Sequence, residues 1–413
     1  MSSPAPSRTQ PARPALVRPA LVRPALLRAA LVRPALVAAA LSGVLFLSAC
    51  SATSTASTGS SDDSAGVEHA TSQIKAASVD PEFTFEGKPF DMSKIAGKTI
   101  FNIPNSSAVP FIVSVDQAGE KLAEQYGAKW IEYTNQGTPT EQSAGIDQAI
   151  SRKADIIVLA QGVNGELIVP ALKRAKAAGI PVLISHTYQT GESLPAQLQP
   201  LVAAQVTAPF HEAAKLNADW AIKETKGTGD VLIITSSEVP PSDGIVKAMQ
   251  SEFSAQCSGC KVKVTNVPVS DWATKISSTV QSAIQSDPNL DYVLPVYDSM
   301  ALFVEAGVTA AGKTGQVHTS SYNGTPAVLK ILQDGSVMTM DIGENMEWLA
   351  YATLDQAGRV LTGTPIVEDG NEQTPLKVFT KDNVDETGTP PVPSKGYGDA
   401  YKTGYEKIWG PAK

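Results

Sequence analysis

Short apolar runs alternate with helix-patterned segments from Lys98 onward, and this alternation limits the possible folds more than any other feature of the chain. A helix between two strands carries the chain back to the same end of the sheet, so such strands pair in parallel. We expect nine strands, at residues 99–103, 129–133, 155–160, 181–185, 230–235, 261–267, 292–296, 316–320 and 337–342. The predicted fold class is therefore α/β with parallel sheets.

The segment that follows residue 137 carries the signals of a helix start. Thr138 can cap the first turn, Pro139 suits the first helical position, and Glu141 stands three residues after the cap, where its carboxylate can reach back. Ile146 and Ile150 then recur at helical spacing. We expect a helix here whose apolar stripe belongs to the core.

Nine strands exceed what one small sheet holds, and the longest interruption of the pattern lies within residues 186–210. We predict two Rossmann-like lobes, one from residues 98–205 with about 344–363, and one from residues 206–343 with the C-terminal segment. Several crossings between the lobes make a hinge, and the interlobe cleft at the carboxyl ends of the strands is the expected ligand site. The Pro- and Gly-rich segment 366–395 has no predicted role beyond a belt across the lobes.

Residues 1–49 have the order of a secretory signal, with basic residues first, apolar residues next and small residues last. They hold six Arg and neither Asp nor Glu. A Pro at every fifth residue disfavours an amphipathic membrane helix there. The final Leu47-Ser48-Ala49-Cys50 resembles the bacterial lipobox, in which the signal is cut before Cys and that Cys is lipidated. We therefore expect Cys50 to carry a lipid.

Residues 50–78 are rich in Ser, Thr, Ala and Gly, which is typical of a flexible tether. No apolar run after residue 50 approaches the roughly 20 residues of a spanning helix. We therefore expect an exported protein that is held on the outer face of the cell membrane by its lipid anchor only. The net charge of −8 includes the basic head, so the body is strongly acidic. An acidic body argues against a nucleic-acid partner.

Cys257 and Cys260 are the two cysteines that remain besides Cys50. A C-x-x-C pair can be a redox centre or half of a metal site, but zinc would need a second pair and the chain has no further Cys. Outside the cell a disulfide is the simpler account. We predict a structural disulfide between a helix and a strand.

Several motifs resemble catalytic or cofactor sites without the context that the chemistry needs. Residues 307–314 fit the P-loop pattern, yet a helix pattern precedes the glycines and a strand pattern follows them, the reverse of a phosphate-binding loop. The acidic stretch 382–386 lacks the spacing of a calcium loop. His211 and His318 lack partners at metal spacing, and His69 lies in the expected tether. We therefore expect no enzyme activity, no cofactor and no metal site.

Four segments, in order along the chain, resemble one known family. They are residues 105–111 (NSSAVPF), 175–182 (AKAAGIPV), 297–302 (YDSMAL) and 322–326 (YNGTP). They resemble type I periplasmic substrate-binding proteins of sugar ABC importers, in the branch similar to ribose-binding protein. The resemblance implies a monomeric body of two lobes, a sugar or polyol as the small-molecule ligand, and the permease subunits of an ABC importer as partners.

The resemblance also implies ligand contacts at named positions of this chain. Asn105 and Phe111 fall on the family's first ligand loop, as an amide for hydroxyl groups and a ring for the apolar face of a sugar. Asn323 lies where the family often has Asp. Asp298 would accept hydrogen bonds from the ligand, and it could also cap the helix that follows it.

Two departures from the family pattern bear on the identity of the ligand. The pair 185–186 (SH) stands where many sugar binders have Asp-Arg, and residues 240–243 (PPSD) stand where they have Arg. Without two Arg donors, we expect a neutral sugar, polyol or similar hydroxylated molecule, with His186 in contact with it. The aromatic residues expected in this pocket are Tyr188, Trp272 and Tyr297.

Other functions share features with this prediction. The same fold also serves ligand-sensing receptors that feed a membrane signalling protein, and this alternative stays open. An extracellular hydrolase would need a nucleophile and a base that we do not find in the sequence. The related repressors need an N-terminal helix-turn-helix, where this chain has its expected signal and tether.

Overall fold

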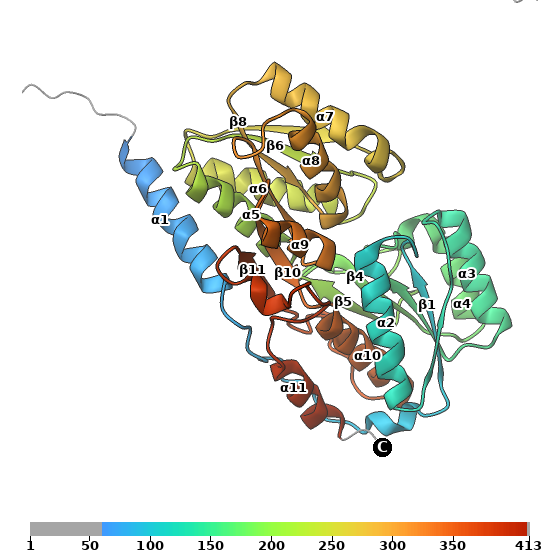
Figure 1. Ribbon diagram of the computed structural model, residues 1–413. Helices are drawn as coiled ribbons and strands as arrows, with labels where there is room; N and C mark the ends of the chain where they lie inside the picture. The colour runs from blue at the N-terminus through green and yellow to red at the C-terminus, as the bar shows by residue number, and fades with distance from the viewer. Residues whose placement is uncertain (1–59, 411–413) are drawn as a thin grey trace, which may run out of the picture. The chain divides into compact units, whose positions relative to one another are not determined.

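The computed structural model describes residues 60–410, in which two mostly parallel sheets with flanking helices form two lobes (Figure 1). The first sheet has five strands in the order β2-β1-β3-β4-β5, all parallel. These strands are β1 (Thr99–Pro104), β2 (Lys129–Glu132), β3 (Ile156–Ala160), β4 (Val182–Gln189) and β5 (Ala204–Ala208). The predicted α/β class with two lobes is confirmed.

Successive residues of the first sheet face opposite layers of helices, as the period of a strand requires. Ile100 and Ile156 pack in one core with α2, α10 and α11, whereas Phe101 and Ile157 pack in another with α3 and α4. The helix α10 thus returns to the first lobe, as its position after the second sheet led us to expect. These helices are α2 (Pro110–Gln125), α3 (Pro139–Ser151), α4 (Val169–Ala177), α10 (Met346–Thr362) and α11 (Ala400–Trp409).

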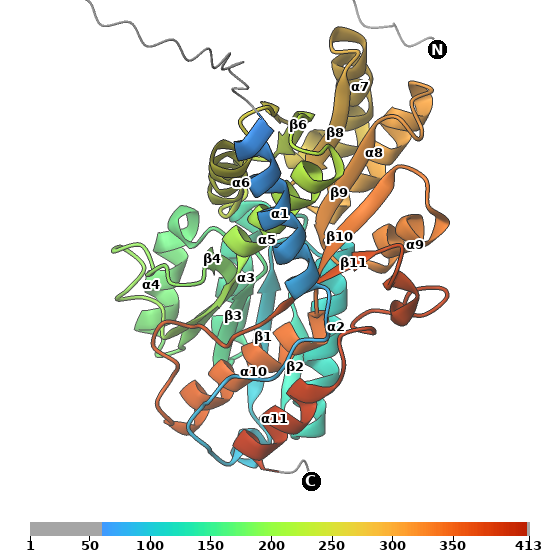
Figure 2. The ribbon, with the colours of Figure 1, turned by 90° about the vertical axis from the view of Figure 1, so that its left-hand side faces the viewer.

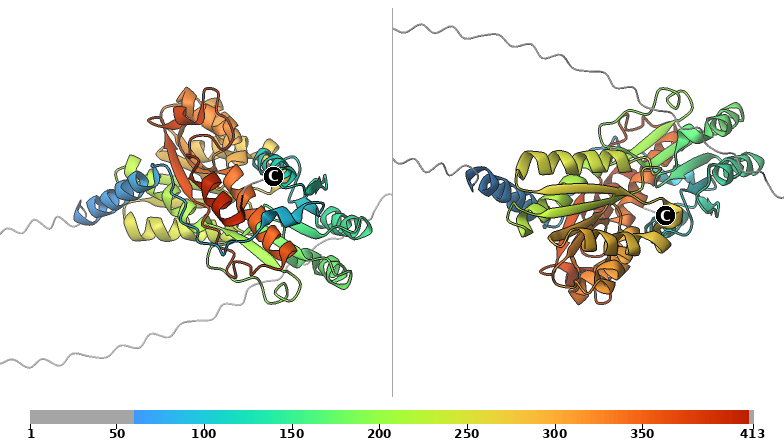
Figure 3. Two further views of the ribbon diagram at one scale, coloured as in Figure 1. Left: turned by 90° about the horizontal axis from the view of Figure 1, so that it is seen from below. Right: turned by 90° about the horizontal axis from the view of Figure 1, so that it is seen from above.

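The second sheet has six strands in the order β11-β10-β9-β8-β6-β7. They are β6 (Asp230–Thr235), β7 (Lys261–Asn266), β8 (Leu290–Pro295), β9 (His318–Asn323), β10 (Met338–Glu344) and β11 (Leu376–Thr380). Helices lie on both faces of this sheet (Figure 3). They are α5 (Phe210–Glu224), α6 (Ser242–Gln256), α7 (Trp272–Ser286), α8 (Asp298–Ala310) and α9 (Pro326–Asp334). Short 3-10 helices are η1 (Met92–Ile95), η2 (Gly165–Ile168), η3 (Val269–Asp271) and η4 (Val384–Thr387).

All nine expected strands are present, and the structure adds β5 and β11. β5 lies in the stretch that we expected to be a crossing, where polar residues interrupt the apolar pattern of a strand. β11 pairs antiparallel with β10 at the edge of the second sheet, and the irregular stretch 363–375 separates it from α10, so the alternation of strand and helix gave no signal for it. Just before β11, Gly370 accepts a hydrogen bond from the Thr207 backbone N–H on β5 (2.8 Å). The segment 366–395 therefore contacts both sheets.

Residues 60–77 form the helix α1 (Ser60–Ala77), which corrects the expectation of a flexible tether over residues 50–78. Ala70 and Ile74 are buried in the core of the second lobe, and Val67 packs against it. Figure 2 shows α1 lying along α5. The small residues that suggested a tether are spaced so that one helical face is apolar, and this face drives the docking.

The expected disulfide, signal and lipid site were the remaining predictions about the fold and the chain's N-terminal part. Cys257 and Cys260 form a disulfide between α6 and β7. The expected signal over residues 1–49 and the expected lipid site at Cys50 lie outside the described residues. Within residues 60–410, we find no helix that is both long and apolar enough to cross a bilayer.

Candidate functional site

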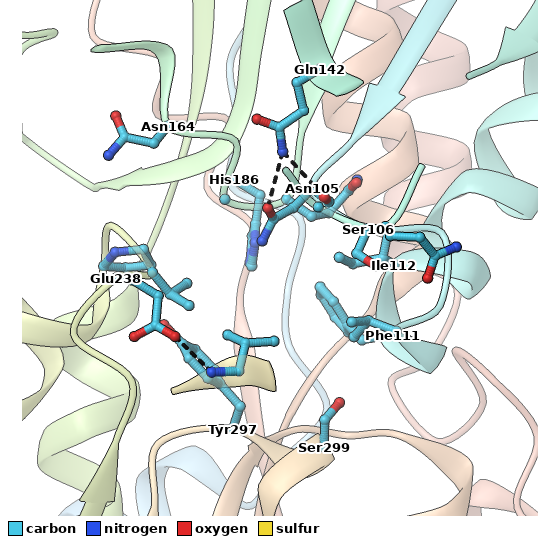
Figure 4. Close-up of a pocket in the computed structure, with 18 of the residues that line it drawn as sticks. Asn105, Ser106, Phe111, Ile112, Gln142, Asn164, His186, Glu238, Tyr297 and Ser299 are labelled. Carbon is cyan, nitrogen blue, oxygen red and sulfur yellow. Dashed lines mark hydrogen bonds between the residues drawn. The ribbon is translucent and has the colours of Figure 1, made fainter. Parts of the chain in front are cut away.

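A cavity of about 440 Å³ lies where the carboxyl ends of strands from both sheets meet (Figure 4). Its volume falls within the roughly 300–1,000 Å³ typical of small-molecule sites. The first lobe contributes the loops after β1, β2 and β3, the starts of α2 and α3, and His186 within β4. The second lobe contributes the loops after β6, β7, β8 and β9. The cavity is therefore the cleft that the strand order predicts.

Asn105 forms the first-lobe wall together with Gln142. The backbone N–H of Asn105 donates to the Ala160 carbonyl (2.9 Å), which ties the loop after β1 to β3. The Gln142 amide donates to the Asn105 backbone carbonyl (3.2 Å) and to its side-chain oxygen (3.4 Å). Gln142 reaches this place because the Thr138 cap starts α3 four residues earlier. Its contacts orient the Asn105 amide at the edge of the cavity.

Three residues in or next to strands have backbone conformations that favour glycine. Gln161, His186 and Asn323 have φ values of 53°, 55° and 147°, and all three line the cavity. Such conformations cost on the order of 1–3 kcal/mol and persist where the surrounding fold holds them. Gln161 follows β3, Asn323 ends β9, and His186 lies where β4 shifts register after Ser185, so at each point the unusual backbone accompanies a side chain at the cavity. Amide and imidazole groups thus converge from three different strands.

Rings cover the apolar side of the cavity. The His186 ring lies 5.3 Å from the Phe111 ring and 4.8 Å from the Phe210 ring, centre to centre. Phe111 comes from the start of α2 and Phe210 from the start of α5, so the two lobes share this surface. Aromatic faces pack well against the C–H faces of a ring-shaped polar ligand.

His186 also connects the two lobes through a buried carboxylate. His186 Nε2 lies 2.7 Å from Glu344 Oε2, and the Tyr322 hydroxyl donates to the same oxygen (2.5 Å). His186 lies within β4 of the first sheet, where the pairing with β5 shifts register after Ser185, whereas Tyr322 and Glu344 lie on β9 and β10 of the second. Burial and the adjacent Glu344 charge raise the pKa of Tyr322 well above its usual value, so its hydroxyl stays protonated and donates.

Trp272 and Tyr297 form the second-lobe wall. The Trp272 indole N–H lies 2.6 Å from the Ser236 hydroxyl, to which it donates. The Tyr297 hydroxyl lies 2.9 Å from the Ser242 hydroxyl, and burial raises the pKa of Tyr297. Both rings are therefore held in fixed positions at the cavity.

Glu238 is the carboxylate at the cavity's outer margin. It is exposed, and it accepts a hydrogen bond from the Val269 backbone N–H (2.6 Å), which joins the loops after β6 and β7. The described lining of the cavity contains no Lys and no Arg. Amides, hydroxyls, aromatic rings and one carboxylate can bind hydroxyl groups, but they offer no cationic partner for an anion.

Six of the eight predicted ligand residues line the cavity. They are Asn105, Phe111, His186, Trp272, Tyr297 and Asn323. Their contact with a ligand stays a prediction.

Tyr188 and Asp298 lie elsewhere, which corrects their assignment to the pocket. Tyr188 packs against the core between the first sheet, α3 and α4, where burial raises its pKa to about 12. Asp298 is fully buried and accepts hydrogen bonds from the Ser321 hydroxyl (2.6 Å) and from the Thr325 backbone N–H (2.7 Å). Its carboxylate therefore points into the second lobe, where it holds the turn before α9.

Several polar residues of the cavity were not predicted. They are Ser106, Gln136, Gln142, Gln161, Asn164, Glu238, Ser270 and Ser299. Gln161 directly follows the buried strand β3, and this position after a strand is the signal by which it could have been found. The sequence gives no reason to distinguish Gln142 from other helix residues. Which loop the start of a helix contacts is decided by packing and cannot be read from the sequence.

Comparison with known proteins places the chain among solute-binding proteins. Residues 100–365 match the family described as "Periplasmic binding protein domain". The D-ribose/D-allose-binding protein of Pseudomonas aeruginosa is 26% identical over 293 residues, which cover 67% of this chain and 87% of that protein. The ribose import binding protein of Escherichia coli is 23% identical, over 66% of this chain and 88% of that protein.

Solved structures resemble the fold in the same way. An ABC transporter solute-binding protein of Agrobacterium vitis, bound with α-D-tagatopyranose, has a TM-score of 0.64 at 22% identity and covers 72% of this chain and 100% of its own. A Bacillus halodurans solute-binding protein with bound myo-inositol has a TM-score of 0.62 at 19% identity, over 72% of this chain and 99% of its own. At these identities the likeness concerns the fold.

Proposed function

The chain belongs to the periplasmic binding protein domain family, and from that premise we propose that it is the solute-binding subunit of an ABC importer for a neutral sugar or polyol. The observation that carries this proposal is the lining of the interlobe cavity. Amides and hydroxyls face rings across it, and no Lys or Arg takes part among the described lining residues. A neutral polyhydroxylated ring satisfies both kinds of surface.

The ligands named for similar proteins support this class of cargo. Ribose, allose, tagatopyranose and myo-inositol are all uncharged and rich in hydroxyl groups. A sugar acid would bring a carboxylate next to Glu238 without a cation to neutralise it. We therefore expect this chain to discriminate against anionic sugars.

Binding would act through closure of the two lobes. Asn105 and Gln161 lie on the first lobe, and Trp272 and Asn323 lie on the second, so a ligand that bonds to both walls stabilises the closed arrangement. The His186–Glu344 pair connects the lobes beneath the ligand. A ligand in contact with His186 would therefore bind next to the contact between the lobes, and its binding would affect their closure directly.

We further propose that the protein is exported, lipidated at Cys50, and monomeric on the outer face of the membrane. The motif that ends at Cys50 supports this proposal. Expression with a radiolabelled fatty acid tests it. Label is expected in the wild-type protein and none in Cys50→Ser, and equal label in both would rule out lipidation at this position.

The cargo can be identified by thermal unfolding of the full chain against neutral sugars, polyols, sugar acids, nucleosides and amino acids. A ligand that binds the folded state raises stability by about 2.7 kcal/mol at a hundredfold excess over Kd. A neutral hydroxylated hit that is recovered unchanged supports the proposal. Preferential stabilisation by a sugar acid would overturn it.

Variants of the cavity then locate the binding site. Asn105→Ala removes an amide from the first-lobe wall, and we expect the affinity for the hit to fall by about 1–3 kcal/mol, or roughly 5- to 150-fold. Tyr188→Phe is the matched control, because Tyr188 lies outside the cavity. Isothermal titration calorimetry measures both affinities. Equal losses in the two variants would place the ligand elsewhere.

A further inference from the structure

A second cluster of polar side chains lies outside the cleft, where α1 docks on the second lobe. His69 of α1, Asp219 of α5 and Glu252 of α6 each offer one ligand atom, and these atoms all lie within 4.8 Å of one another. We propose that these three side chains bind a divalent metal ion, with zinc as the ion that suits them. This proposal does not depend on the cargo of the cleft.

The spacing of the donor atoms fits an ion of this size. Zinc binds imidazole nitrogen and carboxylate oxygen at about 2.0–2.2 Å, so neighbouring donors of a tetrahedral site lie about 3.3–3.5 Å apart. His69 Nε2 and Glu252 Oε1 are already 3.3 Å apart. The Asp219 oxygen lies within 4.8 Å of both of these atoms.

Asp219 gives a second observation that points to a bound ion, because it holds a buried carboxylate oxygen without a partner. Its side chain is only 1% exposed, and its Oδ1 has no hydrogen-bond partner among the described residues. The Glu252 carboxylate, which is also buried, belongs to the same cluster. A buried carboxylate beside a second carboxylate needs either a proton or a cation.

The cluster is accessible to an ion from solvent, and its ligand types favour one kind of ion over others. The His69 side chain is 38% exposed, and the cluster borders a cavity between α1, α5 and the segment before β11. Water can therefore supply the fourth ligand from this side. One imidazole with two carboxylates favours zinc over calcium and magnesium, which prefer oxygen ligands throughout.

The bound ion would fasten α1 to the lobe. α1 precedes the residues that match the family, so the N-terminal flank supplies His69, whereas the matching region supplies Asp219 and Glu252. Apolar burial of Ala70, next to His69, and of Ile74 docks the helix, and the ion would add a second kind of attachment. Metal affinity and stability of the α1 contact should then rise together.

Metal content of the full, untagged chain tests the proposal. After treatment with EDTA and dialysis against zinc, we expect one tightly held zinc per chain by mass spectrometry, with little retention of calcium or magnesium. His69→Ala and Asp219→Asn should each weaken zinc binding by roughly 100-fold or more. His211→Ala is the matched control, because His211 lies on α5 but outside the cluster.

Folding of the variants is checked without metal. Asp219→Asn removes a buried charge, so in EDTA it should unfold at or above the wild-type temperature while losing the zinc-dependent increase. Cobalt substitution gives a visible absorption band for the wild-type site, which should be absent from this variant. The proposal fails if the wild-type protein retains no zinc, in which case His69 and Glu252 are an ion pair and Asp219 is protonated. It also fails if Asp219→Asn and His69→Ala retain zinc as the wild type does.

Discussion

The region that matches the family, residues 100–365, and its two flanks, residues 60–99 and 366–410, attach to the fold through different contacts. The matching region is built of parallel strands whose backbone groups pair along regular ladders. The flanks contribute one strand, β11, and a few single backbone bonds such as the one from the Thr207 N–H to the Gly370 carbonyl, and otherwise attach through side chains. Apolar and aromatic side chains therefore carry most of the attachment of the flanks.

Aromatic rings attach the flanks to the first lobe. Trp348 of α10 stacks with Phe83 at 5.9 Å and with Tyr401 at 4.9 Å between ring centres. Tyr351 stacks with Trp409 at 5.3 Å. α10 belongs to the matching region, whereas its ring partners lie before and after it in the chain. Both flanks thus meet on the outer side of one helix.

The largest expected effect comes from removing the last of these rings. Trp409 is buried and its indole N–H donates to Asp355 Oδ1 (2.6 Å), so Trp409→Ala leaves a cavity and removes the shorter of two hydrogen bonds to that buried oxygen. We expect a loss of about 3–5 kcal/mol in the free energy of unfolding. Urea unfolding followed by circular dichroism measures it. If Trp409→Ala shifts only a small unfolding transition that precedes the main one, the C-terminal flank unfolds separately from the rest of the protein.

The pH dependence of stability that Asp116 contributes tests the region that matches the family, because Asp116 lies on α2 of that region. Burial is the main reason that the pKa of Asp116 on α2 is raised to about 8, with the Glu132 charge adding to it, although Asn102 donates to its carboxyl at 2.7 Å. The unfolded chain has a pKa near 3.9. Between these values the folded state binds one more proton, so this contribution is complete below about pH 4 and is lost as the pH rises through about 8.

Asp116→Asn should remove that dependence. Relative to the wild type, we expect the variant to gain stability between pH 5 and pH 9, by a difference on the order of 4 kcal/mol. Unfolding by urea at several pH values measures the difference. Asp219 titrates in both proteins, so it cancels from the comparison. Parallel curves for the two proteins would show that Asp116 is ionised in the folded state at pH 5.

Ile74→Ala tests the N-terminal flank. Ile74 is 5% exposed where α1 meets the second-lobe core, and its truncation should cost about 2–3 kcal/mol. Val79→Ala is the control, because Val79 is 64% exposed just beyond the helix and its loss should change little. Thermal unfolding of both variants compares them. Equal midpoints would mean that α1 does not dock in solution.

The smallest effect is expected at the cap of α3. Thr138 and Glu141 form a capping box, in which the Thr138 side chain accepts from the Glu141 N–H at 3.2 Å. Thr138→Ala should cost about 1 kcal/mol. Thr140→Ala, at an exposed position of the first turn, should stay within about 0.5 kcal/mol of the wild type. Chemical unfolding separates the two, and the same loss in both would argue against the cap.

Local patterns predicted the parts of the fold that local physics decides. The capping box at Thr138 and the nine strands follow from spacing within short segments. Asn105 and Asn323 were expected at the cleft from the resemblance to the family, and His186 from its place directly after the predicted strand 181–185. β5 and β11 were missed, since their pairing depends on a neighbouring strand rather than on their own apolar pattern.

The sequence by itself determined the α/β class, the two lobes and a neutral cleft at the strand ends, because periodicity and strand order are properties of neighbouring residues. Only the tertiary structure decided where individual side chains point. Asp298 turns into its own lobe, Tyr188 turns into the core, and His69 meets Asp219 although 150 positions separate them. Such contacts depend on how helices pack, and packing joins residues that no local pattern connects.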